Sequence, residues 1–362
     1  MPHPTDAYRA DIDGLRAIAV LAVVGSHASV PFLRGGWVGV DVFFVISGYL
    51  ITSILQRELN AGQFSFLRFY LRRARRILPA LLLVLTATLV AGYFLLLPPD
   101  YRGLGSSIKS VTKFVPNFYF ARQGGYFEPV RNLKPLLMTW SLGVEEQFYF
   151  VFPLVMFALH KLGARKWLWL SIALMASFAW SVQAVAQNPD ASYYLPHLRA
   201  WELLTGACLV WLPAGRQQRP AVNHALSAVG FALIAWAIVA LDEGVPFPGW
   251  RAVPPVLGTA LLIRAGAGAW VNRLLAVKPL VFVGTISYAL YLWHWPLLSL
   301  AYNLRPVPEL PLSVTLPLMG AAVLLATAST FWVEMPLRGI ATPRPARALA
   351  MYAIAIIAVW LL

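Results

Sequence analysis

The first apolar run of the chain carries two ionisable side chains on one helix face. Arg16 and His27, in IDGLRAIAVLAVVGSHASV, are eleven residues apart. At about 100° per residue this is about three turns, so the two side chains share a face and differ in depth by about 16 Å. An ionisable residue inside a membrane span is costly and is by default a functional-site hypothesis. The alternative is a histidine that is simply hydrogen-bonded to a neighbouring helix.

Four arginines open the third apolar run, in the segment FSFLRFYLRRARRILPAL. They are Arg72, Arg73, Arg75 and Arg76. A guanidinium fork binds phosphate oxygens bidentately, so this segment could hold a phosphate-bearing ligand. Arg73 and Arg76 are i, i+3 neighbours on one helix face. A topology anchor or a patch for lipid headgroups is the simpler alternative.

Further ionisable groups occur in the outer halves of later apolar runs, where they could cluster with His27. Glu145 lies in TWSLGVEEQFYFVFP, Glu202 in LRAWELLTG and His294 in SYALYLWHWP. A carboxylate that orients an imidazole is the usual general-base arrangement, so Glu145 is the candidate partner of His27. Local pairing is the alternative, for example Glu202 with Arg199.

Two more acids are candidate supporting residues at the inner side. Asp13 precedes the first apolar run, and Glu334, in FWVEMPLR, could pair with Arg338 or with the basic segment. The sequence has no glycine-rich P-loop, HExxH, GxSxG elbow or zinc-type spacing of Cys and His. These absences give no support to ATP-driven transport or metalloprotease chemistry, and we expect no metal cofactor.

Membrane-spanning helices must position these side chains. The 362-residue chain is 59% hydrophobic and 12% charged, whereas soluble domains carry about 25% charge. A spanning helix needs about 20 mostly apolar residues, and such runs recur along the chain. The pattern predicts an all-α polytopic membrane protein with eleven spans. Their approximate limits are 15–32, 37–56, 77–98, 140–160, 166–186, 199–213, 223–241, 252–266, 281–301, 312–334 and 346–362.

Residues 103–122 form an additional semi-apolar segment that we predict does not cross. Lys109 and Lys113 would face hydrocarbon, and Pro116 would interrupt the helix. If this segment is re-entrant and the N-terminus is cytoplasmic, most basic loops lie inside, as the positive-inside rule requires. The net charge of +14 then reflects topology rather than nucleic-acid binding. The C-terminus is expected outside, in the periplasm.

Seven motifs follow one another across nearly the whole chain. They are YRADIDGLRAIAVLAVVGSHA, GGWVGVDVFFVISGYLIT, FYLRRARRILPAL, TWSLGVEEQFYFVFP, RAWELLTG, ISYALYLWHWP and FWVEMPLR. In this order they resemble the acyltransferase-3 family of membrane O-acyltransferases, which includes O-antigen, peptidoglycan and nodulation-factor acetylases. The resemblance implies a ten-helix bundle with a re-entrant segment over residues 1–340. It also implies that residues 341–362 form an eleventh helix, which in many members leads to an outer SGNH-type domain.

The resemblance also assigns roles to individual residues. Arg16 and His27 match the family's Arg–x10–His motif. Arg73 and Arg76 match its Arg-x-x-Arg pair, with Arg72 and Arg75 as the other register; in the family these arginines are thought to serve the acyl-CoA donor. Two positions depart from the pattern: Met138 stands where a histidine often precedes TWSL, and Phe118 stands where a tryptophan often follows Asn117. The acceptor or the acyl relay could therefore differ here.

Together these observations predict acyl transfer across a bacterial inner membrane. Acetyl-CoA would bind inside through Arg16, Arg73 and Arg76. His27, oriented by Glu145, would act as general base or carry a transient acyl group. The expected acceptor is a hydroxyl of an envelope or lipid-linked glycan, of O-antigen or lipopolysaccharide type, with membrane lipids and a separate SGNH-type domain as further partners. A proton-coupled transporter or glycan exporter is the alternative, because buried His and Glu also build proton relays; a non-catalytic scaffold is the second.

Overall fold

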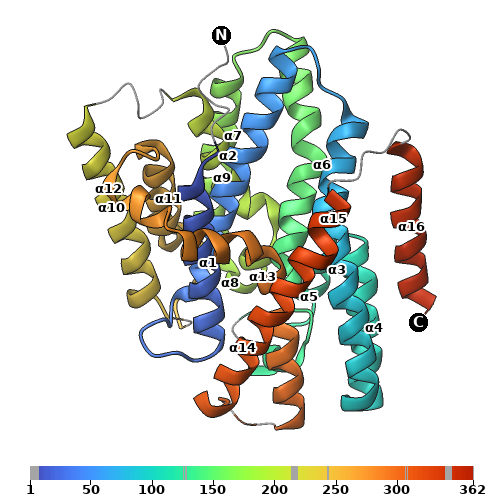
Figure 1. Ribbon diagram of the computed structural model, residues 1–362. Helices are drawn as coiled ribbons and strands as arrows, with labels where there is room; N and C mark the ends of the chain where they lie inside the picture. The colour runs from blue at the N-terminus through green and yellow to red at the C-terminus, as the bar shows by residue number, and fades with distance from the viewer. Residues whose placement is uncertain are drawn as a thin grey trace.

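Every regular element of the described residues is a helix in the computed structural model (Figure 1). The structure describes residues 8–124, 126, 129–212, 219–242, 244–305, 307, 309–338 and 345–361. The principal helices are α1 (Ala10–His27), α2 (Gly39–Asn60), α3 (Phe66–Leu95), α4 (Pro98–Thr112), α5 (Pro116–Ala121), α6 (Thr139–Lys161), α7 (Lys166–Gln187), α8 (Pro189–Tyr194), α9 (Pro196–Cys208), α10 (Pro220–Ala240), α11 (Val253–Ala265), α12 (Trp270–Leu275), α13 (Lys278–Leu304), α14 (Leu312–Ala328), α15 (Met335–Arg338) and α16 (Pro345–Leu361).

The predicted all-α polytopic membrane fold is confirmed. Within the described chain, seven helices are long and apolar enough to cross a membrane: Gly36–Asn60, Phe66–Leu95, Thr139–Lys161, Lys166–Gln187, Pro220–Ala240, Lys278–Leu304 and Leu312–Arg338. The other four predicted spans also coincide with helices, namely α1, α9, α11 and α16. Of these, α9 and α11 have 13 residues each. Such a helix rises about 20 Å against a hydrocarbon core of about 30 Å.

Local sequence signals place many helix starts. Proline occupies the first turn of α4, α5, α9 and α13, where its missing N–H removes no intrahelical bond. Ser65 caps α3 by accepting a hydrogen bond from the backbone N–H of Arg68. The start of the arginine-bearing helix is therefore fixed by a side chain directly before the FLRFYLRRARR segment.

Backbone-to-backbone packing sets the position of α1. This helix packs along α13 and against α2 and α12. A Cβ atom on Gly14 would lie 1.8 Å from the carbonyl oxygen of Leu275, and one on Gly284 would lie 1.9 Å from that of Asp13. Only glycine permits this close approach. The contacts fix the end of α1 that carries Asp13 and Arg16.

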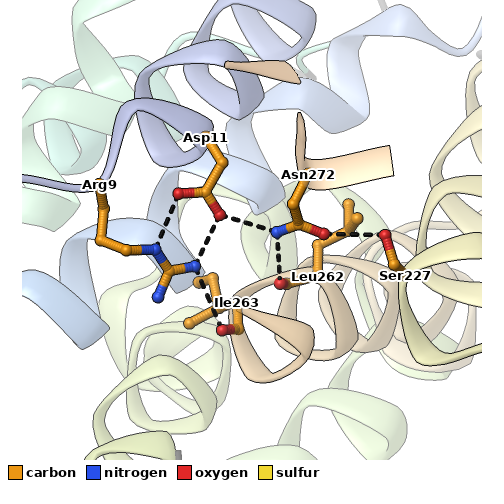
Figure 2. Close-up of polar contacts among 6 residues, drawn as sticks. All are labelled: Arg9, Asp11, Ser227, Leu262, Ile263 and Asn272. Carbon is orange, nitrogen blue, oxygen red and sulfur yellow. Dashed lines mark hydrogen bonds and ion pairs between the residues drawn. The ribbon is translucent and has the colours of Figure 1, made fainter. Parts of the chain in front are cut away.

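A buried polar network ties the first turn of α1 to the α11–α12 region (Figure 2). Arg9 donates two hydrogen bonds to the Asp11 carboxylate, at 2.8 and 2.7 Å. Asn272 donates to Asp11 at 2.7 Å and to the carbonyl of Leu262 at 2.9 Å, and it accepts from Ser227 at 2.8 Å. Asp11 is thereby paired and hydrogen-bonded, as a buried charge requires.

Residues 103–122 do not form one spanning helix. α4 ends at Thr112, and α5 begins at Pro116. The Asn117 side chain, on α5, donates to the carbonyl of Tyr194 at 3.1 Å and accepts from Gln147 at 2.8 Å. The last helix, α16, packs on α3 and α4 (right edge of Figure 1). Its Trp360 donates to the Thr112 hydroxyl at 2.7 Å, so it contacts the end of α4.

Candidate active site

Three arginines from two helices line one cavity of about 90 Å³ between α1, α2, α3, α6 and α13. We call it the arginine cavity. Arg16 comes from α1, and Arg73 and Arg76 come from adjacent turns of α3. The remaining lining residues are Val40, Phe43, Phe44, Ile46, Ser47, Leu50, Ile51, Ile77, Ser141, Leu142, Glu145, Tyr149, Ser287, Tyr288, Tyr291 and Leu292. Three cations and one carboxylate line this space, which favours an anionic ligand.

The structure separates the two registers of the basic segment. Arg73 and Arg76 face the arginine cavity, whereas Arg72 and Arg75 do not line it. Arg72 instead binds Glu58 at 2.7 Å on the surface. Among the described residues, the buried Nε of Arg73 has no hydrogen-bond partner. A buried N–H without a partner costs free energy, and a bound anion would satisfy it.

Asp13 holds Arg16 in place. Its carboxylate accepts a bond from Arg16 at 3.1 Å and one from the Tyr8 hydroxyl at 2.6 Å. The hydrogen bond to Asp13 raises the pKa of Tyr8 to about 12, so this hydroxyl stays protonated at neutral pH. Asp13 therefore supports the arginine cavity from the end of α1.

His27 is paired with a second histidine. The His27 Nδ1 and His294 Nε2 atoms lie 3.1 Å apart, and the two rings are parallel and edge to edge, with centroids 5.3 Å apart and 1° between their planes. Nδ1 of His294 lies 3.2 Å from the carbonyl oxygen of Leu290 and the His27 Nε2 lies 3.2 Å from the Tyr126 hydroxyl. Both imidazoles are buried.

The hydrogen-bond chain assigns both tautomers. Because a carbonyl can only accept, Nδ1 of His294 must carry the proton, and its Nε2 is then an acceptor. His27 consequently donates from Nδ1, and its Nε2 is the lone pair, which accepts from the Tyr126 hydroxyl. The result is a neutral imidazole whose basic nitrogen is defined by its partners.

Glu145 does not contact His27 among the described contacts, so the predicted carboxylate–imidazole pair is wrong. Glu145 lines the arginine cavity, where it accepts hydrogen bonds from Ser47 and, at 2.7 Å, from Tyr149. Met138, just before α6, lies beside Tyr126 near the histidine pair, with its sulfur 3.5 Å from the Tyr126 hydroxyl oxygen. Seven residues of helix carry Glu145 about 10 Å further along the axis. The position beside His27 is occupied by His294 instead.

Tyr291 stands between the arginine cavity and the histidine pair. It lines the cavity, and its ring centroid lies 5.4 Å from that of His294, one turn further along α13. Its hydroxyl lies 2.7 Å from that of Ser141 and 3.0 Å from the carbonyl of Met138. The signal in the sequence is the i, i+3 spacing of Tyr291 and His294, which places both side chains on one helix face.

Glu202 and Glu334 lie outside both groups. Glu202 pairs with Arg199 at 3.1 Å, and Arg199 also binds Asp41 at 3.0 Å. Glu334 binds Arg338 and accepts from Thr330. The local-pairing alternatives for these two glutamates therefore hold.

The Arg199 ion pairs sit inside an aromatic cage. The guanidinium carbon lies 5.3–5.6 Å from the ring centroids of Phe44, Trp140, Tyr193 and Phe247. Tyr193 in turn stacks on Tyr126, with centroids 4.1 Å apart. The cage thus supports the tyrosine that contacts His27. Tyr126 lies in a connection without helical periodicity, so no sequence signal identified it.

Known proteins are similar to this chain over most of its length. A family model described as an acyltransferase domain matches residues 9–335. The peptidoglycan O-acetyltransferase OatA of Listeria monocytogenes is 31% identical over 353 residues, covering 93% of this chain and 56% of that protein. YrhL of Bacillus subtilis, a candidate peptidoglycan O-acetyltransferase, is 32% identical over 363 residues, covering 93% and 56%. A candidate O-acetyltransferase of Staphylococcus aureus (strain MSSA476) is 32% identical over 359 residues, covering 91% and 57%.

The chain spans just over half the length of these relatives. No solved structure matches it.

Proposed function

Because this chain belongs to the acyltransferase-3 family and is an O-acyltransferase, we propose that it carries an acetyl group from cytoplasmic acetyl-CoA to a hydroxyl of a glycan across the membrane. The observation that carries this proposal is the arginine cavity, which meets the histidine pair at Tyr291. One face of the bundle would then bind the donor, and the other would receive the acceptor.

The donor's phosphates would bind to Arg16, Arg73 and Arg76. These side chains converge from α1 and α3 on one cavity. Their planar forks suit phosphate oxygens, and the unpartnered Nε of Arg73 is a donor ready for such a ligand. The alternative of a topology anchor explains exposed Arg72 better than it explains half-buried Arg73, whose Nε atom is buried.

The pantetheine arm would extend along α1 from the arginines toward His27. α1 is continuous from Ala10 to His27, so Arg16 and His27 differ in depth by about 16 Å. Tyr291 lies on this path. Its ring would have to swing aside, or the acyl group would have to pass beside it, before the thioester reaches the histidine pair.

His27 would serve as general base through Nε2. An acceptor hydroxyl would replace Tyr126 at this nitrogen and lose its proton to it. The hydroxyl oxygen attacks the thioester carbon, so that a C–O ester bond forms and the C–S bond breaks. The proton then passes from His27 to the departing CoA thiolate. His294 would hold the ring and accept from Nδ1 throughout.

We propose a glycan of the peptidoglycan type as acceptor in preference to a lipopolysaccharide. The support is the printed names of the relatives, two of which refer to peptidoglycan. Since the chain covers 56% of each of these proteins, the acceptor of the whole relatives is carried over as a proposal only.

Acetyl-CoA binding by purified protein in nanodiscs tests the donor assignment. Calorimetry would compare wild type, Arg73→Ala with Arg76→Ala, and His27→Ala. Hydrogen bonds to charged groups contribute about 1.5–3 kcal/mol each, so the double variant should lose more than about 100-fold in affinity. His27→Ala should bind normally but should not transfer the acetyl group.

The matched control is Arg72→Ala with Arg75→Ala. It removes the same charge from the same helix, away from the arginine cavity. Equal losses in the two double variants would reduce the arginines to a nonspecific basic patch. A folded wild type that binds no acyl-CoA would refute the donor and favour a proton-coupled transporter.

A further inference from the structure

A small apolar recess adjoins the arginine cavity beside Tyr291. Its walls come from α3, from the connection that leads into α6, and from α13. The lining residues are Leu81, Val84, Leu85, Pro135, Leu136, Met138, Thr139, Tyr291, Leu292, Trp295 and Pro296. Tyr291 and Leu292 also line the arginine cavity, so the two spaces share a wall.

The recess also borders the surroundings of His27. Trp295, which lines it, packs edge-on against the His27 ring with centroids 4.8 Å apart. The indole N–H of Trp295 donates to the carbonyl of Lys134 at 2.9 Å, which fixes the ring. Met138 lines the recess as well and contacts the hydroxyl of Tyr126, the other partner of His27. An acyl carbon brought to His27 would therefore have this recess beside it.

The size of the recess is that of one small group. Its volume is about 10 Å³, close to the space taken by a single water-sized probe. The α3 side of its wall is closely packed, because Leu81, Val84 and Leu85 are at most 1% exposed. Close-packed walls of this kind do not yield an extra methylene without strain.

We propose that this recess receives the methyl end of the acyl group and restricts the donor to two-carbon acyl chains. This inference rests on the proposed function. We take Val84 and Leu85 as its specificity-determining residues; together with Leu81 they form the side of the recess that belongs to α3. The extra carbons of a propionyl or butyryl chain would clash with these two side chains.

Truncation of Leu85 tests the proposal. The measurement is CoA thiol released by purified protein in nanodiscs from acetyl-, propionyl- and butyryl-CoA, with chitotetraose as the acceptor probe. One methylene in an apolar pocket changes selectivity by about 10–200-fold. Leu85→Ala should therefore raise the propionyl-to-acetyl ratio of kcat/KM by at least about tenfold.

Leu89→Ala is the matched control. Leu89 lies one turn further along α3 and is also buried, but it lines neither cavity. Both variants remove the same atoms from the same helix, so a general loss of packing affects them alike. The ratio should stay at the wild-type value in Leu89→Ala.

Val84→Leu tests the recess in the opposite direction. One added methylene should lower kcat/KM for acetyl-CoA by about tenfold or more. Binding of CoA without an acyl group, measured by calorimetry, should stay unchanged, because the arginine cavity is not altered.

The outcomes separate this inference from the proposed function. If wild type turns over acetyl-CoA and Leu85→Ala keeps the wild-type chain-length ratio, or Leu89→Ala shifts it equally, the recess assignment is wrong. A wild type that already accepts butyryl-CoA as well as acetyl-CoA also overturns it. If wild type binds acyl-CoA but releases no CoA from any donor, the proposed role of His27 as general base is wrong. No acyl-CoA binding at all refutes the donor.

Discussion

His27 and His294 lie edge to edge in parallel planes, with 1° between the planes and 3.1 Å between Nδ1 of the first and Nε2 of the second. The carbonyl of Leu290 determines the tautomer of His294 and, through it, that of His27. His294 thus occupies the position beside His27 that the sequence predicts for Glu145. The contact between the two histidines predicts how variants of the site change acyl transfer and donor binding.

Replacement of His294 should impair catalysis without affecting donor binding. In His294→Ala, Nδ1–H of His27 loses its acceptor and the ring can adopt the other tautomer. A misassigned tautomer in a comparable base costs up to about 10⁴-fold in kcat, and we expect a loss of at least about 100-fold. His294→Gln, whose amide oxygen can accept, should recover part of it. The measurement is transfer rate alongside acetyl-CoA affinity.

His160→Ala is the control for the histidine pair. His160 lies near the other end of α6 and contacts Lys166 at 3.1 Å, away from His27. Its activity should match wild type. If His294→Ala also transferred at the wild-type rate, the pair would be a packing contact only.

Tyr126→Phe should have a smaller effect than either histidine change. The phenol occupies Nε2 of His27 in the absence of an acceptor, and the ring retains its stacking on Tyr193 after the hydroxyl is removed. We expect less than about a tenfold change in kcat, since one neutral hydrogen bond contributes about 0.5–1.5 kcal/mol. Steady-state kinetics would measure it. A loss as large as that of His27→Ala would assign the hydroxyl a direct chemical role.

Glu145→Gln should change donor affinity more than the transfer step. The carboxylate shares the arginine cavity with Arg16, Arg73 and Arg76, so its removal leaves more uncompensated positive charge for an anionic ligand. Acetyl-CoA should bind several-fold more tightly in calorimetry. If Glu145 instead oriented His27, the variant would bind normally and lose transfer as His294→Ala does.

The difference between Glu145 and His294 explains what the sequence could and could not predict. Helical spacing gives depth at about 1.5 Å per residue, so the shared face of Arg16 and His27 and the i, i+3 register of Arg73 and Arg76 followed from the sequence. Spacing does not say which helix lies beside which. The contact between α1 and α13 brings His294 to His27, and it depends on tertiary packing. The eleven apolar runs were predicted as helices, since each run is itself the signal.

Crowding at the contact between α1 and α12 should make Gly14 intolerant of a side chain. A Cβ there would lie 1.8 Å from the carbonyl oxygen of Leu275, and overpacking costs about 1–3 kcal/mol. Gly14→Ala should lower the Tm in detergent. Gly320→Ala is the control, because nothing lies within 4 Å of its Cβ and alanine is the better helix former by about 1 kcal/mol. If Gly14→Ala and Gly320→Ala had the same Tm, α1 and α12 would be able to move apart without loss of stability.

The buried ion pairs of Arg199 should be far more sensitive than any surface charge. Arg199→Met leaves Asp41 and Glu202 buried without their cation. Breaking such a pair costs about 3–5 kcal/mol, whereas replacing all of its members by neutral groups can be close to neutral. We therefore expect little folded protein from Arg199→Met. Partial recovery is expected when Asp41→Asn and Glu202→Leu are added.

Size-exclusion profiles and Tm would test this, with exposed Arg305→Met as the control. The same experiment reaches the active site, because Tyr193 links the Arg199 cage to Tyr126 and hence to His27. A recovered triple variant that folds but transfers slowly would mean that the cage positions Tyr126. Full activity in that variant would confine the ion pairs to stability. If Arg199→Met were as stable as Arg305→Met, the buried carboxylates of Asp41 and Glu202 would not need a cation.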